Sequence, residues 1–214
     1  MMERRRMLGI LVAGSAGLAA SGSPSLAAAA PVPGADRDDW LDALASRRHK
    51  AFLDIRSYAT DGTPFRKAAN LMRALTEAYG AKPEEVGIAF GAGSSSIGHI
   101  LGPAIWEEYK VGAKVAGHAR SPEEAASLRT EPRKWATSNG EEIATMRRMG
   151  IRVLGCRNSI ARWSRDFAAE SGESPEAVNA KLLAGLHEGV EPVPAMIAAA
   201  VLAQGRDLSY VAIG

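Results

Sequence analysis

Residues 51–80 read AFLDIRSYATDGTPFRKAANLMRALTEAYG. The short apolar run at 51–57 predicts a β-strand. After a loop, Thr63 is expected to cap a helix whose first residue is Pro64, since a proline at that position loses no helical hydrogen bond. Gly80 is expected to end this helix. The segment therefore predicts a strand, a loop and a helix, the first part of a parallel β-α-β unit.

The same order of elements repeats along the rest of the chain. Further strands are expected at 86–90, 151–155, 190–193 and 208–213. Helices are expected at 97–109, 122–128, 140–149, 158–170, 175–186 and 195–204. The helix at 140–149 is assigned because Ser138 and Glu141 have the spacing of a capping box, and a short strand at 113–116 is left open. Strands that alternate with helices predict right-handed crossovers and a three-layer α/β/α domain with a mainly parallel, five-stranded sheet.

Three loops of this domain follow the carboxyl ends of strands, where ligands and reactive side chains collect in parallel sheets. They are residues 58–63, 91–99 and 155–158. We therefore expect the functional site to lie in these loops.

The first 29 residues predict an export signal. Arginines at 4–6 precede an apolar run at 7–20 and a stretch of alanines at 27–30, which is the order of a cleavable signal peptide. The run is shorter than the roughly 18–20 residues that span a bilayer, so no stable membrane anchor is expected after cleavage. The paired arginines are typical of the twin-arginine route, but Glu3 and Gly9 depart from its motif, so the general secretory route stays open. The protein is expected in the periplasm or secreted.

Removal of residues 1–29 also changes the net charge. The full chain has 26 basic and 24 acidic residues, and the removed part holds three Arg and one Glu, which leaves 23 of each. A neutral chain gives no reason to expect nucleic acid as a partner. Residues 30–48 begin with a Pro/Gly/Asp-rich stretch and are predicted to be a flexible tether, so the expected domain spans residues 49–214.

Cys156 is the only cysteine, so the chain has no internal disulfide to form. It stands where a predicted strand ends and a helix begins, a position at which the helix dipole favours a thiolate. Arg157, Arg162 and Arg165 follow within three turns and favour negative charge as well. A lone cysteine is otherwise a small residue that fills space in a core. The thiol is therefore buried and inert, paired between chains, or chemically employed.

The loop after the second predicted strand is the other candidate site. Its small residues include Gly91, Gly93, Ser94, Ser95 and Ser96. Amides and hydroxyls of this kind suit an anion, although Gly and Ser are also what tight turns contain. The loop matches neither the dinucleotide fingerprint nor the phosphate loop. His99 follows as a candidate base or metal ligand, but the four histidines are scattered, so neither a metal nor a cofactor is expected.

The last third of the chain carries a family resemblance. It contains Gly150-Ile-Arg-Val-Leu-Gly-Cys156, then Gly189-Val-Glu-Pro-Val-Pro-Ala195, and then Gln204-Gly-Arg-Asp-Leu-Ser-Tyr210. These stretches resemble the cysteine-ended strand, the G-V-x-x-V-P-A segment, and the closing helix and strand of the DsrE/DsrF-like family. The first half has a compatible order of strands and helices, so the resemblance covers about Lys50 to Ile213.

The resemblance implies a flavodoxin-like sheet and assembly into homo-oligomers, either trimers or hexamers. In the best understood branch of the family a cysteine carries sulfur as a persulfide between proteins, and its position corresponds to Cys156. Arg157, Asn158 and the 91–96 loop are then expected around the thiol, with a sulfur donor or acceptor protein as partner. A non-catalytic module that binds a small ligand in the same pocket is the alternative. The export signal and a long insert at 163–186 depart from the family's pattern.

Overall fold

The structure is a computed structural model that describes residues 39–213. The predicted export signal and the first part of the predicted tether lie outside the described residues. No helix in the described part of the chain is both long enough and apolar enough to cross a membrane.

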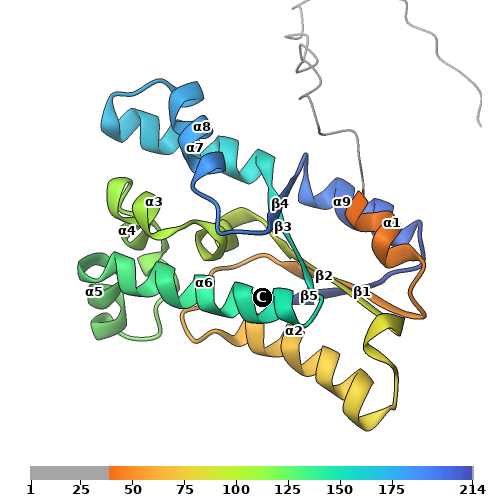
Figure 1. Ribbon diagram of the computed structural model, residues 1–214. Coiled ribbons are helices and arrows are strands. Elements are labelled where there is room, and N and C mark those ends of the chain that lie inside the picture. Colours follow the sequence, from red (N-terminus) through yellow and green to blue (C-terminus); the bar gives the residue numbers. More distant parts are fainter. Residues whose placement is uncertain (1–38, 214) are drawn as a thin grey trace, which may run out of the picture. The chain divides into compact units, whose positions relative to one another are not determined.

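A five-stranded sheet forms the centre of the domain, and every pair of neighbouring strands in it is parallel (Figure 1). The strands are β1 (His49–Ile55), β2 (Val86–Ala92), β3 (Arg152–Cys156), β4 (Val190–Val193) and β5 (Ser209–Ile213). They lie in the order β4-β3-β2-β1-β5, so the chain adds strands in one direction as far as β4 and then crosses to the other side of β1. The five expected strands and the predicted three-layer, flavodoxin-like α/β/α fold are confirmed.

Helices cover both faces of this sheet (Figure 1). The α-helices are α1 (Asp39–Ala45), α2 (Thr63–Arg73), α3 (Pro103–Glu108), α4 (Val111–Val115), α5 (Pro122–Thr130), α6 (Pro132–Arg148), α7 (Arg157–Ser171), α8 (Pro175–Ala184) and α9 (Met196–Gln204). Segments of π-helix or 3₁₀-helix are η1 (Ala74–Ala78), η2 (Pro83–Glu85), η3 (Ser94–Ile100) and η4 (Ala116–His118). The buried side chains of α2 to α8 share one hydrophobic cluster, and those of α1 and α9 share the other.

The predicted tether is wrong from Asp39 onward, because residues 39–45 form α1. Trp40, Leu41 and Leu44 are buried on one side of this helix. The Trp40 ring packs against Phe52 of β1 with 6.1 Å between ring centroids. Three apolar side chains at helical spacing outweigh the Pro/Gly-rich stretch before them, since burying them removes a large apolar area from water.

Three helical segments also differ from the sequence prediction. Residues 113–116 belong to α4 and η4 and form no strand, and the helix expected at 97–109 is divided between η3 and α3. The helix expected from Gly140 begins at Pro132, so the capping pattern at 138–141 lies inside it. Helix α4 is fixed by tertiary contact: a Cβ atom built on Gly112 would lie 1.7 Å from the Leu128 carbonyl oxygen.

We predict that Trp40→Ala lowers the free energy of unfolding by about 3 kcal/mol, because it empties the contact between α1 and β1. Urea denaturation measures this. The exposed Arg48→Ala serves as the control and should leave the free energy of unfolding within about 0.5 kcal/mol of the wild type. A Trp40 variant as stable as the control would mean that α1 does not pack on the sheet.

Candidate functional site

The carboxyl ends of β3 and β4 are the point where the chain changes direction across the sheet. The two strands are neighbours, and Cys156 pairs with Val193 in their register. Helix α7 after β3 packs in the cluster of α2 to α8, whereas α9 after β4 packs in the opposite cluster. The two connections therefore leave on opposite faces and open a crevice between them, the usual ligand position in an open α/β sheet.

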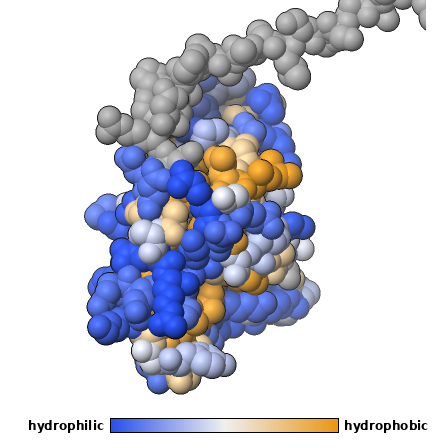
Figure 2. All heavy atoms as spheres, turned by 90° about the vertical axis from the view of Figure 1, so that its right-hand side faces the viewer, coloured by the Kyte–Doolittle hydropathy of each residue, from blue (hydrophilic) through white to orange (hydrophobic). Residues whose placement is uncertain are grey.

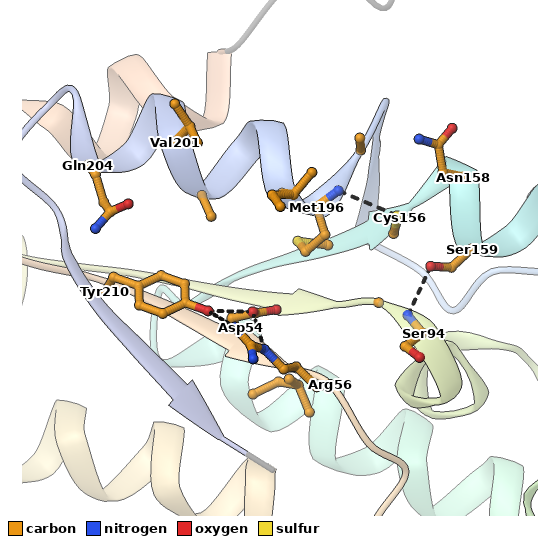
Figure 3. Close-up of a pocket in the computed structure, with 15 residues that line it drawn as sticks. Asp54, Arg56, Ser94, Cys156, Asn158, Ser159, Met196, Val201, Gln204 and Tyr210 are labelled. Carbon is orange, nitrogen blue, oxygen red and sulfur yellow. Dashed lines mark hydrogen bonds and ion pairs between the residues drawn. The ribbon is translucent and has the colours of Figure 1, made fainter. Parts of the chain in front are cut away.

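A pocket of about 580 Å³ lies at this edge of the sheet, beneath α9 (Figure 3). Strand ends, the segments directly after them and the first turn of α7 supply Asp54, Ile55, Arg56, Gly93, Ser94, Cys156, Asn158 and Ser159. Helix α9, its preceding residue and β5 supply Ala195, Met196, Ile197, Ala200, Val201, Gln204 and Tyr210. An apolar wall with a few polar groups gathered at its ends is the usual composition of a small-molecule site.

Cys156 forms part of the inner wall of this pocket. It is the last residue of β3 and the residue before α7, and its side chain belongs to the cluster beneath α9. Only 5% of Cys156 is exposed. The backbone N–H of Met196 donates a hydrogen bond to its sulfur, with 3.4 Å between nitrogen and Sγ. Cys156 is a free thiol, recessed in the pocket and held by the first turn of α9.

A polar cluster of Asp54, Arg56 and Tyr210 lines the same pocket (Figure 3). Arg56 Nε lies 2.9 Å from Asp54 Oδ2, and Arg56 Nη2 donates to the Tyr210 hydroxyl at 2.6 Å. That hydroxyl in turn donates to Asp54 Oδ2 at 2.6 Å. The hydrogen bond to Asp54, together with burial, raises the pKa of Tyr210. The sequence prediction missed all three residues. Asp54 and Arg56 could have been noticed as two opposite charges on either side of Ile55 at the end of β1.

The predicted anion loop contributes only Gly93 and Ser94 to the pocket. The Gly93 N–H bonds the Ile55 carbonyl and the Ser96 hydroxyl, and the Ser94 N–H bonds the Ser159 hydroxyl at 2.9 Å. The Ser95 hydroxyl accepts from the Tyr58 N–H. Because these amides and hydroxyls already have partners in the loop and in the neighbouring segments, the loop does not present a cradle of amides to an anion.

Gly91 has a packing role between β2 and α9. A Cβ atom built on it would lie 2.5 Å from Met196 Sδ and 3.0 Å from the Phe52 ring. The small residue therefore lets Met196 of α9 approach β2.

His99 lies outside the pocket and is fully buried in the core. Its Nε2 accepts the Ala59 N–H at 3.1 Å, and its Nδ1 lies 3.3 Å from Asn139 Oδ1. Its ring stacks on Tyr58 with 4.2 Å between centroids. Burial lowers the pKa of His99 to about 4, so the ring is neutral at physiological pH. The prediction of His99 as a site residue is not supported by this geometry, because both ring nitrogens are used to hold the loop after β1.

The residues expected next to the thiol divide in two. Asn158 lines the pocket, and so does Ser159, which the sequence prediction missed. Arg157 does not line the pocket. Its buried Nε has no hydrogen-bond partner in the part of the chain that the structure describes. Residues 156–159 start a helix, so successive side chains point in different directions, and only some of them face the pocket.

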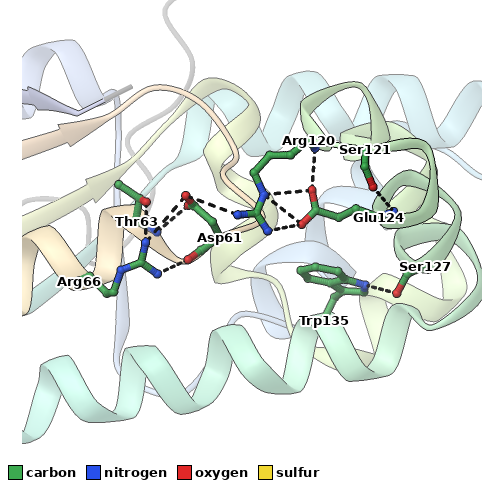
Figure 4. Close-up of polar contacts among 8 residues, drawn as sticks. All are labelled: Asp61, Thr63, Arg66, Arg120, Ser121, Glu124, Ser127 and Trp135. Carbon is green, nitrogen blue, oxygen red and sulfur yellow. Dashed lines mark hydrogen bonds and ion pairs between the residues drawn. The ribbon is translucent and has the colours of Figure 1, made fainter.

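A second polar cluster fixes the loop between β1 and α2 (Figure 4). Arg120 lies between Asp61, at 4.0 Å, and Glu124, at 2.7 Å. Hydrogen bonds from the Arg120 side chain lower the pKa of Glu124 to about 2. The Thr63 hydroxyl and N–H lower the pKa of Asp61. These contacts tie α5 to the loop and are structural. Across the described residues, no group of three or more His, Cys, Asp or Glu side chains is placed to hold a metal ion.

Fold and site together define a parallel α/β domain with a thiol-lined pocket at its topological switch point. No protein-family model and no curated protein sequence matches the chain.

We predict that burial of His99 makes the protein less stable in mild acid. The pKa of His99 is about 4 in the folded chain and about 6.5 when unfolded, so the unfolded chain binds a proton first as the pH falls. Stability from this residue is complete above about pH 6.5 and declines by about 3 kcal/mol towards pH 4. Urea denaturation at several pH values measures the slope.

His99→Gln should lose most of this dependence between about pH 6.5 and pH 4, whereas His49→Gln, at the start of β1, should keep it. Equal slopes in the wild type and the His99 variant would contradict the buried, neutral state.

Proposed function

We propose that this domain accepts sulfane sulfur on Cys156 and passes it on as a persulfide. The observation that carries the proposal is the place of the thiol: it lines a pocket of about 580 Å³ at the switch point of the sheet. The C-terminal stretches that resemble the DsrE/DsrF-like family support the same role for Cys156. Export to the periplasm or beyond remains part of the proposal and rests on residues 1–29 of the sequence.

The chemistry is a displacement at sulfur. With thiosulfate as donor, the Cys156 thiolate attacks the outer sulfur, a new S–S bond forms, and the bond to the sulfonate sulfur breaks. Sulfite leaves with the electron pair of the broken bond, and Cys156 holds a persulfide. The thiol proton goes to solvent before the attack. An acceptor thiolate then attacks the terminal sulfur and restores the Cys156 thiolate.

The groups around the sulfur suit the negative charge that Cys156 carries as a thiolate and as a persulfide. The Met196 N–H already donates to Sγ, at the first turn of a nine-residue helix, where backbone N–H groups favour negative charge. The side chains of Ser94, Asn158 and Ser159 add polar groups to the same wall. A donor that enters the pocket therefore meets hydrogen-bonding groups next to the sulfur.

A binding module that does not use the thiol is the second candidate function. The apolar wall of α9 and the Asp54–Arg56–Tyr210 cluster favour it, because they form a complete small-molecule site by themselves. The two functions share the pocket and differ in one property, the reactivity of Cys156.

We predict that wild-type protein incubated with thiosulfate or polysulfide gains one sulfur atom on Cys156, seen by mass spectrometry of the intact chain and its peptides. Cys156→Ser should gain none and should keep the circular dichroism spectrum and the unfolding midpoint of the wild type. A wild-type thiol that takes up no sulfur while the protein is folded would rule out the carrier and favour the binding module.

We also predict that the pocket is the route to the sulfur. Ile197→Trp places a bulky ring at an exposed position of the lining, and it should slow alkylation of Cys156 by iodoacetamide about tenfold or more. Leu202→Trp is the matched control, since Leu202 is exposed on the same helix but does not line the pocket. Equal rates in the two variants would mean that reagents reach the thiol by another path.

The resemblance to the DsrE/DsrF-like family also leads us to propose that the protein assembles into trimers or hexamers. Strand β5 lies at the edge of the sheet, so its outer backbone N–H and C=O groups are available to a strand of a second copy. Sedimentation velocity of the mature chain tests the assembly, and a monomer at all concentrations would remove it.

A further inference from the structure

We infer that the pocket is built for an organic carboxylate with an aliphatic body, the carboxylate held by Arg56 and the body lying against α9. This inference rests on the proposed function in one respect: it names the chemical class of the sulfur donor or acceptor that Cys156 meets. It is argued from the geometry of Arg56, the exposure of α9 and the shape of the pocket.

Arg56 is held in place on one edge and free on the other. Its Nε–H bonds Asp54 and one Nη2–H bonds Tyr210, at 2.9 and 2.6 Å. A guanidinium carries five N–H donors in a fixed plane, so the end-on edge formed by Nη1 and Nη2 keeps its donors. The described residues accept no hydrogen bond from that edge. A planar, oriented and unused edge is the geometry that binds a carboxylate through two parallel hydrogen bonds.

Tyr210 and Asp54 act as positioning residues for this guanidinium. The Tyr210 hydroxyl bridges Asp54 and Arg56, and Asp54 is only 15% exposed, whereas Arg56 is 63% exposed. The Asp54 carboxylate is therefore turned inward and occupied, and the guanidinium faces solvent and the pocket. An entering anion meets the cation of this pair first.

The opposite wall of the pocket is apolar and uncovered. Ile197 is 79% exposed and Val201 is 63% exposed, one turn apart on α9, and both line the pocket. Figure 2 shows the side of the molecule that carries α1 and α9, with apolar side chains gathered near its top amid a hydrophilic surface. Aliphatic side chains left in water beside a cavity favour a ligand with a hydrocarbon segment, since its binding removes both surfaces from water.

The test uses two disulfides of equal chain length. One is the symmetric disulfide of mercaptohexanoic acid, and the other is that of mercaptohexanol, which is neutral. In each case the Cys156 thiolate attacks one sulfur, the S–S bond breaks, and one mercapto compound leaves as its thiolate, so that a mixed disulfide forms on Cys156. Rates are followed by intact mass and divided by the rates of the same reagents with free cysteine.

The wild type is expected to prefer the acid about tenfold or more after this correction, as for one charged hydrogen-bonded pair. Arg56→Gln should remove the preference, so that the ratio of the corrected rates for the two reagents falls to about one. Arg73→Gln, an exposed arginine on α2, is the control and should keep the preference. Equal corrected rates for the two reagents in a reactive wild type would overturn the inference and leave the proposed function standing.

A second measurement separates the two ideas if the thiol is inert. Cys156→Ser is titrated with hexanoate and with hexanol, and binding is followed by amide chemical shifts. Hexanoate is expected to shift the amides around Arg56 and α9, with Arg56→Gln in the same background abolishing the shifts. Hexanoate binding together with a Cys156 that takes up no sulfur from thiosulfate or polysulfide would reject sulfur transfer and keep the carboxylate site, whereas no hexanoate binding would reject the site.

Discussion

The pairing of Cys156 with Val193, at the ends of two strands whose connections leave on opposite faces, is the constraint on which the site depends. Right-handed crossovers place helices on one face while strands are added in one direction, and on the other face once the direction reverses. This reversal opens the crevice, and it brings the first turn of α9 over the sulfur. It also carries β5 to the far side of β1, where Tyr210 meets Asp54 and Arg56.

Much of the fold was predictable because its signals are local. The central strands β2 and β3 are short apolar runs that are almost wholly buried in the parallel sheet, and most helices begin at a proline or end at a glycine. The errors fall where tertiary contact decides. Residues 138–141 have capping residues but lie inside α6, because Pro132 starts that helix earlier. Helix α4 has only five residues and depends on its contact with α5.

The candidate site was predictable only in part, for a related reason. Cys156 was found because its position at the end of a strand can be read along the chain. Arg56 and Tyr210 are 154 positions apart and meet only because β5 pairs with β1, which no local pattern encodes. The serines of the 91–96 loop were over-interpreted, since the sequence does not show that Ser95 and Ser96 bond the backbone of neighbouring segments. His99 was over-interpreted in the same way.

The recessed position of the sulfur also narrows what the thiol can do. A disulfide between two copies requires Cα atoms within about 7 Å, and a cysteine that is 5% exposed beneath α9 does not allow that approach. A protein partner would have to insert its own thiol on an extended segment into the pocket. A small molecule meets no such barrier, because a pocket of about 580 Å³ is large enough to admit it. This enclosure keeps larger disulfides away from the thiol, so the geometry favours exchange with small molecules over direct relay between folded proteins.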